Sequence, residues 1–85
     1  MHEVVLSAPA ERDLKRLPVA FFHRVIAVIR ALAQNPRPPG CRRLHGSGHD
    51  DYRIRVGDYR VVYEVDDTAT LVRIMRVRHR REIYR

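Results

Sequence analysis

The fold of this 85-residue chain is decided by residues 52–64, which run YRIRVGDYRVVYE. β-Branched and aromatic residues alternate with arginines on both sides of Gly57-Asp58, a pattern typical of a β-hairpin with a two-residue turn. This turn pairs Val56 with Tyr59, Arg55 with Arg60 and Ile54 with Val61. Because side chains alternate across a strand, one face of the hairpin is apolar. It carries Tyr52, Ile54, Val56, Tyr59, Val61, Tyr63 and Val65.

The opposite face carries three arginines, Arg53, Arg55 and Arg60. Like charges directly opposite each other destabilise a sheet, so the cluster needs an explanation. One explanation is an anion held between them, and phosphate fits because a guanidinium group donates two parallel hydrogen bonds to it. The other is an ordinary solvated surface on which Glu64 dilutes the repulsion. The hairpin alone leaves both open.

The charge of the whole chain also indicates an anionic partner. Seventeen basic residues against ten acidic ones give a formal net charge of +7, and all but one of the basic residues are arginine. Residues 73–85 alone hold six arginines and a single acid, Glu82. Clustered arginine is typical of a nucleic-acid binder, although a polyanionic protein partner accounts for it equally well.

Length and cysteine content limit the class of protein. A chain of 85 residues predicts a single domain, residues 1–85. Its one cysteine, Cys41, excludes an internal disulfide, and no Cys/His spacing indicates a metal site. The free thiol, the absence of a signal sequence and the absence of an apolar run of membrane-spanning length predict a cytoplasmic protein without membrane contact.

The remaining elements follow from apolar spacing and from helix signals. A short strand at residues 2–7 precedes a helix from Ala8 to Arg16, for which Ser7 is a suitable N-cap. A second helix, Val19 to Gln34, has a wide apolar stripe that predicts packing on a sheet. A proline-rich break at residues 35–40 leads into a loop through residue 50, and after the hairpin a third strand runs from Leu71 to Val77. Periodicity does not decide which face of that strand is buried, and residues 80–85 form a short tail.

The order β-α-α-β-β-β predicts an α+β fold with two N-terminal helices packed on one face of a twisted antiparallel sheet. The short turns between the C-terminal strands allow only an antiparallel meander. The other face of the sheet is then open, and we expect it to be the face with the hairpin arginines.

These features together resemble a known family. The element order, the Leu44-His45-Gly46 step, the hairpin and the ending RVRHRREIYR at residues 76–85 resemble the RelE/ParE superfamily of bacterial and archaeal toxins, and the RelE branch in particular. The resemblance covers essentially the whole chain. It implies the toxin of a type II toxin–antitoxin system, an endoribonuclease that cleaves mRNA on the ribosome without metal or other cofactor. The ribose 2′-hydroxyl attacks the adjacent phosphate and the 5′-oxygen leaves.

The resemblance also implies partners. A cognate antitoxin holds such a toxin inactive, the mRNA is met in the ribosomal A site, and the toxin–antitoxin complex binds its own operator through the antitoxin. Some relatives continue into a further helix that the antitoxin displaces. This chain stops one residue past Tyr84, so we expect neutralisation by direct occlusion.

Two groups of site residues follow from the resemblance. Arg60 matches the hairpin arginine that holds the scissile phosphate, and Arg53 and Arg55 match positions where relatives carry basic residues, in some cases lysine. An arginine stays protonated, so both bind charge but are poor general bases. Arg78 and Arg43 complete the expected RNA-binding set. Some relatives carry a base in the preceding loop, where Arg42 or Arg43 is the closest match and His45 is a substitute candidate.

The tail is expected to supply the other catalytic groups. His79 matches a position where several relatives carry histidine as acid or base, although without the resemblance it is simply a polar residue in a basic tail. Either Arg80 or Arg81 fills the role of the family's tail arginine. Tyr84 matches a C-terminal tyrosine that stacks on a base or hydrogen-bonds near the ribose, or else anchors the tail on the sheet.

Two other functions compete with the ribonuclease. One is a ParE-like, non-catalytic toxin that inhibits DNA gyrase, and the other is a plain nucleic-acid-binding module. A phosphate cradle combined with a titratable group favours the ribonuclease over a gyrase binder. A plain single-strand binder is expected to expose aromatic platforms, and most tyrosines here fall on the apolar face of the hairpin.

Overall fold

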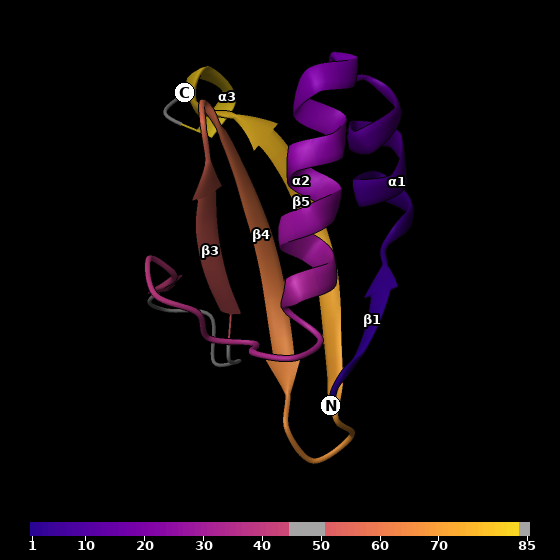
Figure 1. Ribbon diagram of the computed structural model, residues 1–85, viewed down its shortest axis with the longest axis vertical. Helices are drawn as coiled ribbons and strands as arrows, with labels where there is room; N and C mark the ends of the chain where they lie inside the picture. Colours follow the sequence, from indigo (N-terminus) through magenta and orange to yellow (C-terminus); the bar gives the residue numbers. More distant parts are fainter. Residues whose placement is uncertain (45–50, 84–85) are drawn as a thin grey trace.

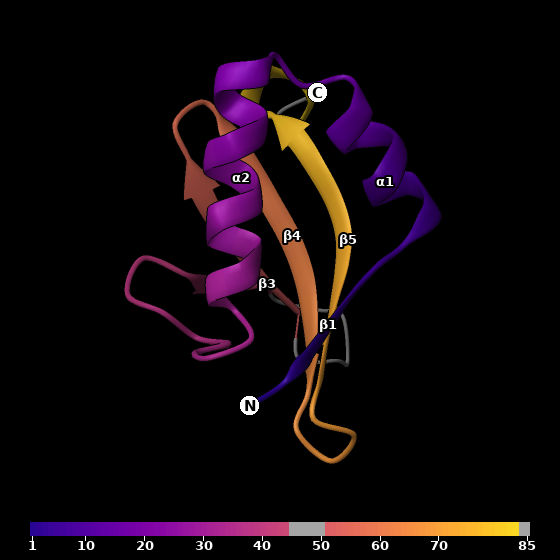
Figure 2. The same cartoon turned by 45° about the vertical axis from the view of Figure 1, so that its right-hand side comes forward.

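The computed structural model describes residues 1–44 and 51–83, with one mixed sheet and two helices packed over one of its faces (Figures 1 and 2). The sheet order is β1-β5-β4-β3-β2. A third, very short helix follows the last strand. In chain order the elements are β1 Glu3–Leu6, α1 Ala8–Lys15, α2 Val19–Ala31, β2 Arg42–Arg43, β3 Asp51–Val56, β4 Tyr59–Asp66, β5 Leu71–His79 and α3 Arg80–Ile83.

The predicted fold class is confirmed, and three details go beyond it. First, β1 runs parallel to β5, with Val4 opposite Val72, while the other strand pairs are antiparallel. The helices carry the chain back across the sheet, which a parallel pair requires. Second, Arg42–Arg43, expected in a loop, form the edge strand β2 against β3. Third, α2 ends at Ala31 rather than Gln34, because the chain tightens into i→i−3 hydrogen bonds ahead of Pro36.

The hairpin has the predicted register. Val56 lies opposite Tyr59, Arg55 opposite Arg60 and Ile54 opposite Val61. At the tip, Gly57 has a φ of +59°, and a Cβ there would approach the Phe21 ring to 3.0 Å, so the turn requires glycine.

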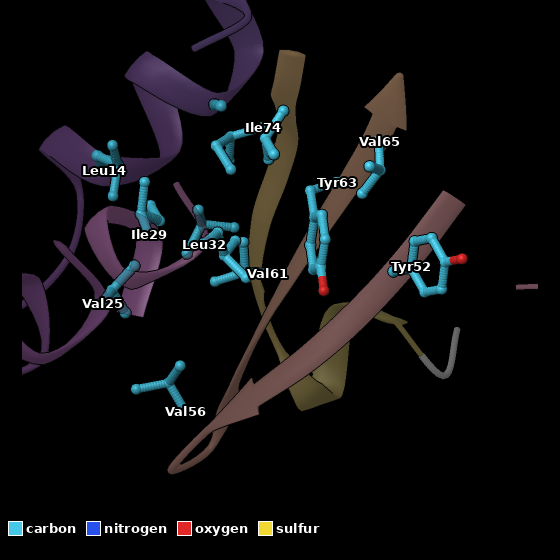
Figure 3. Close-up of a cluster of buried hydrophobic side chains, with 13 residues drawn as sticks. Leu14, Val25, Ile29, Leu32, Tyr52, Val56, Val61, Tyr63, Val65 and Ile74 are labelled. Atoms are coloured by element: carbon cyan, nitrogen blue, oxygen red, sulfur yellow. The ribbon is translucent and has the colours of Figure 1, made fainter. Parts of the chain in front are cut away.

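The apolar face of the hairpin meets the helices in one core (Figure 3). Val61, Tyr63 and Val65 of β4 are almost completely inaccessible to solvent, and side chains of α1 and α2 pack against them. The buried set is Ala10, Leu14, Val25, Ile29, Leu32, Tyr52, Val56, Val61, Tyr63, Val65, Val72, Ile74 and Val77.

A β-bulge in β5 resolves the face that periodicity left open. Tyr63 lies opposite Ile74 but Val62 lies opposite Arg76, so Met75 is an extra residue in β5. Val72 and Ile74 are buried before the bulge, and Val77 is buried after it. Neither alternating set of residues 71–78 is therefore buried throughout. Beyond the bulge, Arg78 lies opposite Arg60 and therefore points to the open face of the sheet.

Ser7 joins α1 to the sheet through a single hydroxyl group. As the N-cap of α1, its Oγ accepts a hydrogen bond from the Ala10 N–H at 3.2 Å and donates one to the Met75 carbonyl at 2.9 Å. We expect Ser7→Ala to lower the free energy of unfolding by about 1–2 kcal/mol, because a cap and a tertiary hydrogen bond are lost together. Urea denaturation measures this, with Ser7→Thr as the variant that keeps the hydroxyl. Equal stability of the alanine and threonine variants would contradict this role.

Candidate functional site

Five arginines gather on the open face of the sheet. Arg60 lies directly between Arg55 on β3 and Arg78 on β5, and Arg42 lies opposite Arg53 two residues further along β3. Neighbouring strands are about 4.8 Å apart, so these side chains leave the sheet from adjacent positions. We call these five residues the arginine face. Three of them, Arg53, Arg60 and Arg78, are half-buried, and Arg42 and Arg55 are exposed.

Four of these arginines surround a hollow of about 560 Å³. Its lining comprises Pro39, Gly40, Arg42, Arg53, Ile54, Arg55 and Arg60. The Arg55 Nε donates a hydrogen bond to the Gly57 carbonyl at 2.9 Å, which holds its guanidinium group toward the hairpin turn. Glu64, the acid that could have diluted the repulsion, forms an ion pair of 2.8 Å with Arg73. The hollow therefore concentrates positive charge and suits an anion with several acceptor oxygens.

The proline-rich segment that walls the hollow is fixed to the core. Tyr63, fully buried, donates its hydroxyl to the Pro36 carbonyl at 2.8 Å, and burial raises the pKa of Tyr63. The Arg37 Nε donates to the Tyr52 hydroxyl at 2.8 Å, and its Nη2 lies 2.8 Å from Asp67 Oδ2. Hydrogen bonds from Arg37 and then from His2 lower the pKa of Asp67. These contacts position the wall formed by Pro39 and Gly40.

His79 lies on the other side of the sheet. It pairs with Tyr59 across β4 and β5, and the two rings meet edge-on with centroids 5.3 Å apart. Tyr59 in turn packs on Phe21 of α2 at 5.0 Å, which places both rings on the helix-covered face. Because Arg60 is paired with Arg78, strand alternation turns His79 away from it. Arg60 and His79, both expected to be catalytic, therefore leave the sheet on opposite faces, and their joint role in catalysis stays a prediction.

The hydrogen bond at His79 also bears on its chemistry. The Arg81 backbone N–H donates to His79 Nδ1 at 3.2 Å. A neutral imidazole that accepts at Nδ1 carries its proton at Nε2, so Nε2 is a donor. To act as a base through Nε2, His79 would have to break this bond and change tautomer. With this hydrogen bond in place, the neutral ring of His79 presents an N–H donor at Nε2.

The other expected site residues divide into three groups. Arg43 lies opposite the buried Tyr52, so its register separates it from the arginine face, and Arg42 takes the position beside Arg53. Arg80 and Arg81 begin α3 and are exposed, and the Arg80 N–H donates to the Asp58 carbonyl at 2.8 Å, which attaches α3 to the hairpin tip. His45 and Tyr84 lie outside the described residues.

The described residues hold neither a metal-binding cluster nor a membrane-spanning helix. Across residues 1–44 and 51–83, no group of three or more His, Cys, Asp and Glu side chains is placed to hold a metal ion. Within the same residues, every helix is too short or too polar to cross a bilayer.

Comparison with known proteins places the chain in a family. The family described as "ParE toxin of type II toxin-antitoxin system, parDE" matches residues 4–84. Toxin RelG of Mycobacterium tuberculosis is 35% identical over 88 residues, which cover 99% of this chain and 97% of RelG. Toxin RelE of the same organism is 35% identical over 85 residues, which cover 99% of this chain and 87% of RelE. The archaeal RelE–RelB complex from Pyrococcus horikoshii OT3 matches with a TM-score of 0.83 and 30% identity over 93% of this chain and 94% of that chain. The chain, with its arginine-bearing hairpin, therefore belongs to the RelE/ParE superfamily of type II toxins.

Proposed function

We propose that this toxin is an endoribonuclease that cleaves mRNA, and that the arginine face binds the scissile phosphate. The observation that carries the proposal is the row Arg55–Arg60–Arg78 on three neighbouring strands. Like charges placed directly opposite each other destabilise a sheet. A sheet face that is merely exposed to solvent has no need to place arginines in this way. A bound phosphate converts the repulsion into a set of charge-assisted hydrogen bonds.

The proposed reaction needs no metal. The ribose 2′-oxygen forms a bond to the adjacent phosphorus, the bond from phosphorus to the 5′-oxygen breaks, and a 2′,3′-cyclic phosphate and a 5′-hydroxyl result. One proton leaves the 2′-hydroxyl and one reaches the 5′-oxygen. Negative charge grows on the non-bridging oxygens, where Arg60 and its two neighbours supply fixed positive charge. Arg53 and Arg42 hold the adjoining backbone.

The proton transfers are the part for which the arginine face is least suited, because arginine stays protonated. We propose that the tail residues Arg80, Arg81 and Tyr84 assist the leaving group. We further propose that the ribosomal A site orients the mRNA so that its 2′-hydroxyl is aligned for attack. Efficient cleavage of naked RNA by the purified chain would count against this dependence on the ribosome.

The solved relatives support a protein partner. The Pyrococcus horikoshii structure is a RelE–RelB complex, and another matching structure is the toxin–antitoxin complex RelBE2 from Mycobacterium tuberculosis. We propose that a cognate antitoxin neutralises this toxin by covering the arginine face, and that the complex binds its own operator through the antitoxin.

A gyrase-inhibiting toxin is the second candidate, because the matching family is described by the name ParE. Adding the purified chain to a translation reaction and mapping cleavage sites by primer extension separates the two, with gyrase supercoiling assayed in parallel. We expect discrete mRNA cuts and unchanged supercoiling. Intact mRNA together with blocked supercoiling would establish the second candidate instead.

A further inference from the structure

A second hollow lies on the helix side of the sheet, between α1 and the end of β5. It has a volume of about 280 Å³, and the residues of its lining that bear on binding are Asp13, Arg16, Tyr59, Arg76, Arg78 and His79. We call it the α1–β5 hollow. We propose that it is a second phosphate subsite, which holds the RNA backbone where it passes round the edge of β5. This inference rests on the proposed ribonuclease function.

The charge of the α1–β5 hollow favours an anion. Three arginines, Arg16, Arg76 and Arg78, and one aspartate, Asp13, belong to its lining. The Asp13 carboxylate accepts hydrogen bonds from Arg76 Nε at 2.8 Å, Arg76 Nη2 at 3.2 Å and the Val77 N–H at 2.9 Å. With three arginines against one aspartate among these residues, the α1–β5 hollow carries a net positive charge.

The fold connects this hollow with the arginine face. Arg78 lies opposite Arg60 in the sheet and also lines the α1–β5 hollow. Because β1 pairs with β5 only as far as Ile74, the last part of β5 is an edge of the sheet. An RNA backbone that leaves the arginine face at Arg78 can therefore pass round this edge and enters the α1–β5 hollow next.

His79, which lines the hollow, offers it a hydrogen-bond donor. With Nδ1 occupied by the Arg81 N–H, the proton of the neutral ring lies at Nε2, and Tyr59 fixes the ring by an edge-on contact. A phosphate oxygen is the acceptor that such a donor and a neighbouring arginine suit. This assigns His79 to binding of the RNA backbone.

The test uses two 2′-O-methyl RNAs, which lack the attacking hydroxyl, of about three and about ten nucleotides, since single-strand sites span about 4–16 nucleotides. Arg16→Gln, at the C-cap of α1, is compared with Arg12→Gln, an exposed arginine of α1 outside the lining. We expect Arg16→Gln to weaken binding of the longer RNA about fivefold. The slope of log affinity against log salt concentration should fall by about 0.7, as it does when one phosphate contact is lost. The shorter RNA should bind as before, and Arg12→Gln should bind both as the unmutated toxin does.

Each other outcome overturns the subsite. Equal losses in the two variants would mean that only overall charge matters, and failure of the unmutated toxin to bind the longer RNA would remove the basis of the inference. Weaker binding of a poly-glutamate peptide without any change for RNA would assign the hollow to an acidic protein segment. The ribonuclease proposal is judged separately, because primer extension on translated mRNA reports cleavage whatever the affinity for free RNA.

Discussion

Replacing Arg60 by alanine is expected to reduce mRNA cleavage at least about 100-fold and to abolish toxicity. Arg60 is the central member of the row on the arginine face, with Arg55 on one side and Arg78 on the other. Removing one preorganised donor from a developing oxyanion typically costs about 10²–10³ in rate. Arg55 and Arg78 already occupy the two flanking positions of the row. Single-turnover cleavage of mRNA on programmed ribosomes measures the effect directly.

The same variant is expected to keep its fold. Arg60 leaves the sheet on the open face, while on the other face Val61 fills the core and Tyr59 packs on Phe21. Its removal also relieves the repulsion from Arg55 and Arg78, so the free energy of unfolding should stay within about 0.5 kcal/mol or rise. Lost cleavage with unreduced stability separates a functional cluster from a solvated surface. Unimpaired cleavage by Arg60→Ala would refute the assignment of the scissile phosphate.

Three further variants sharpen this test. Arg30→Ala removes the same charge from an exposed position on α2 and should cleave normally. Arg60→Lys keeps the charge but loses the planar fork, so we expect activity between that of the alanine variant and that of the unmutated toxin. His79→Ala should reduce mRNA cleavage only about fivefold, the loss expected when one contact to the RNA backbone is removed. A loss as large as that of Arg60→Ala would show that the two residues act at one phosphate after all.

The hairpin could be predicted from the sequence because its information is local. Gly57-Asp58 and the strict alternation around it fix both turn and register, so Arg53, Arg55 and Arg60 were placed on one face correctly. The helices follow for the same reason, from the Ser7 cap and the spacing of their apolar residues.

The position of His79 could not be predicted, because it depends on the bulge at Met75. Without that extra residue, Arg78 would share a face with the buried Val72 and Ile74, and His79 would point to the open face. The bulge reverses these two orientations, so Arg78 points to the open face and His79 to the helix-covered face. Met75 has no local signal for a bulge, because the irregularity arises from pairing with β4. Arg42 was missed for a similar reason, since a two-residue strand becomes visible only through its partner β3.

The largest effect on stability is expected for Asp13→Ala. Beyond Ile74, β5 has no strand partner on the β1 side, and Asp13 of α1 takes that place by accepting the Val77 N–H at 2.9 Å. The carboxylate is 9% exposed and also binds Arg76. Alanine leaves a backbone donor and a guanidinium group without their acceptor. We expect a loss of about 3 kcal/mol in the free energy of unfolding, measured by urea denaturation at pH 7. Glu11→Gln, an exposed change on the same helix, should cost less than about 0.5 kcal/mol.

Low pH should weaken the same interaction, because it protonates the Asp13 carboxylate. Burial alone would raise the pKa of Asp13, but the hydrogen bonds from Arg76 and Val77 outweigh it and hold the pKa below its ordinary value. A carboxyl whose pKa is lower in the folded chain than in the unfolded chain stabilises the fold above the unfolded pKa, and this contribution is lost as pH falls through the folded pKa. The difference in stability between the unmutated toxin and Asp13→Ala should therefore be constant near neutrality and shrink below about pH 4. A difference that stayed the same down to pH 2 would mean that the packing of α1 on β5, rather than the charge of Asp13, holds this edge of the sheet.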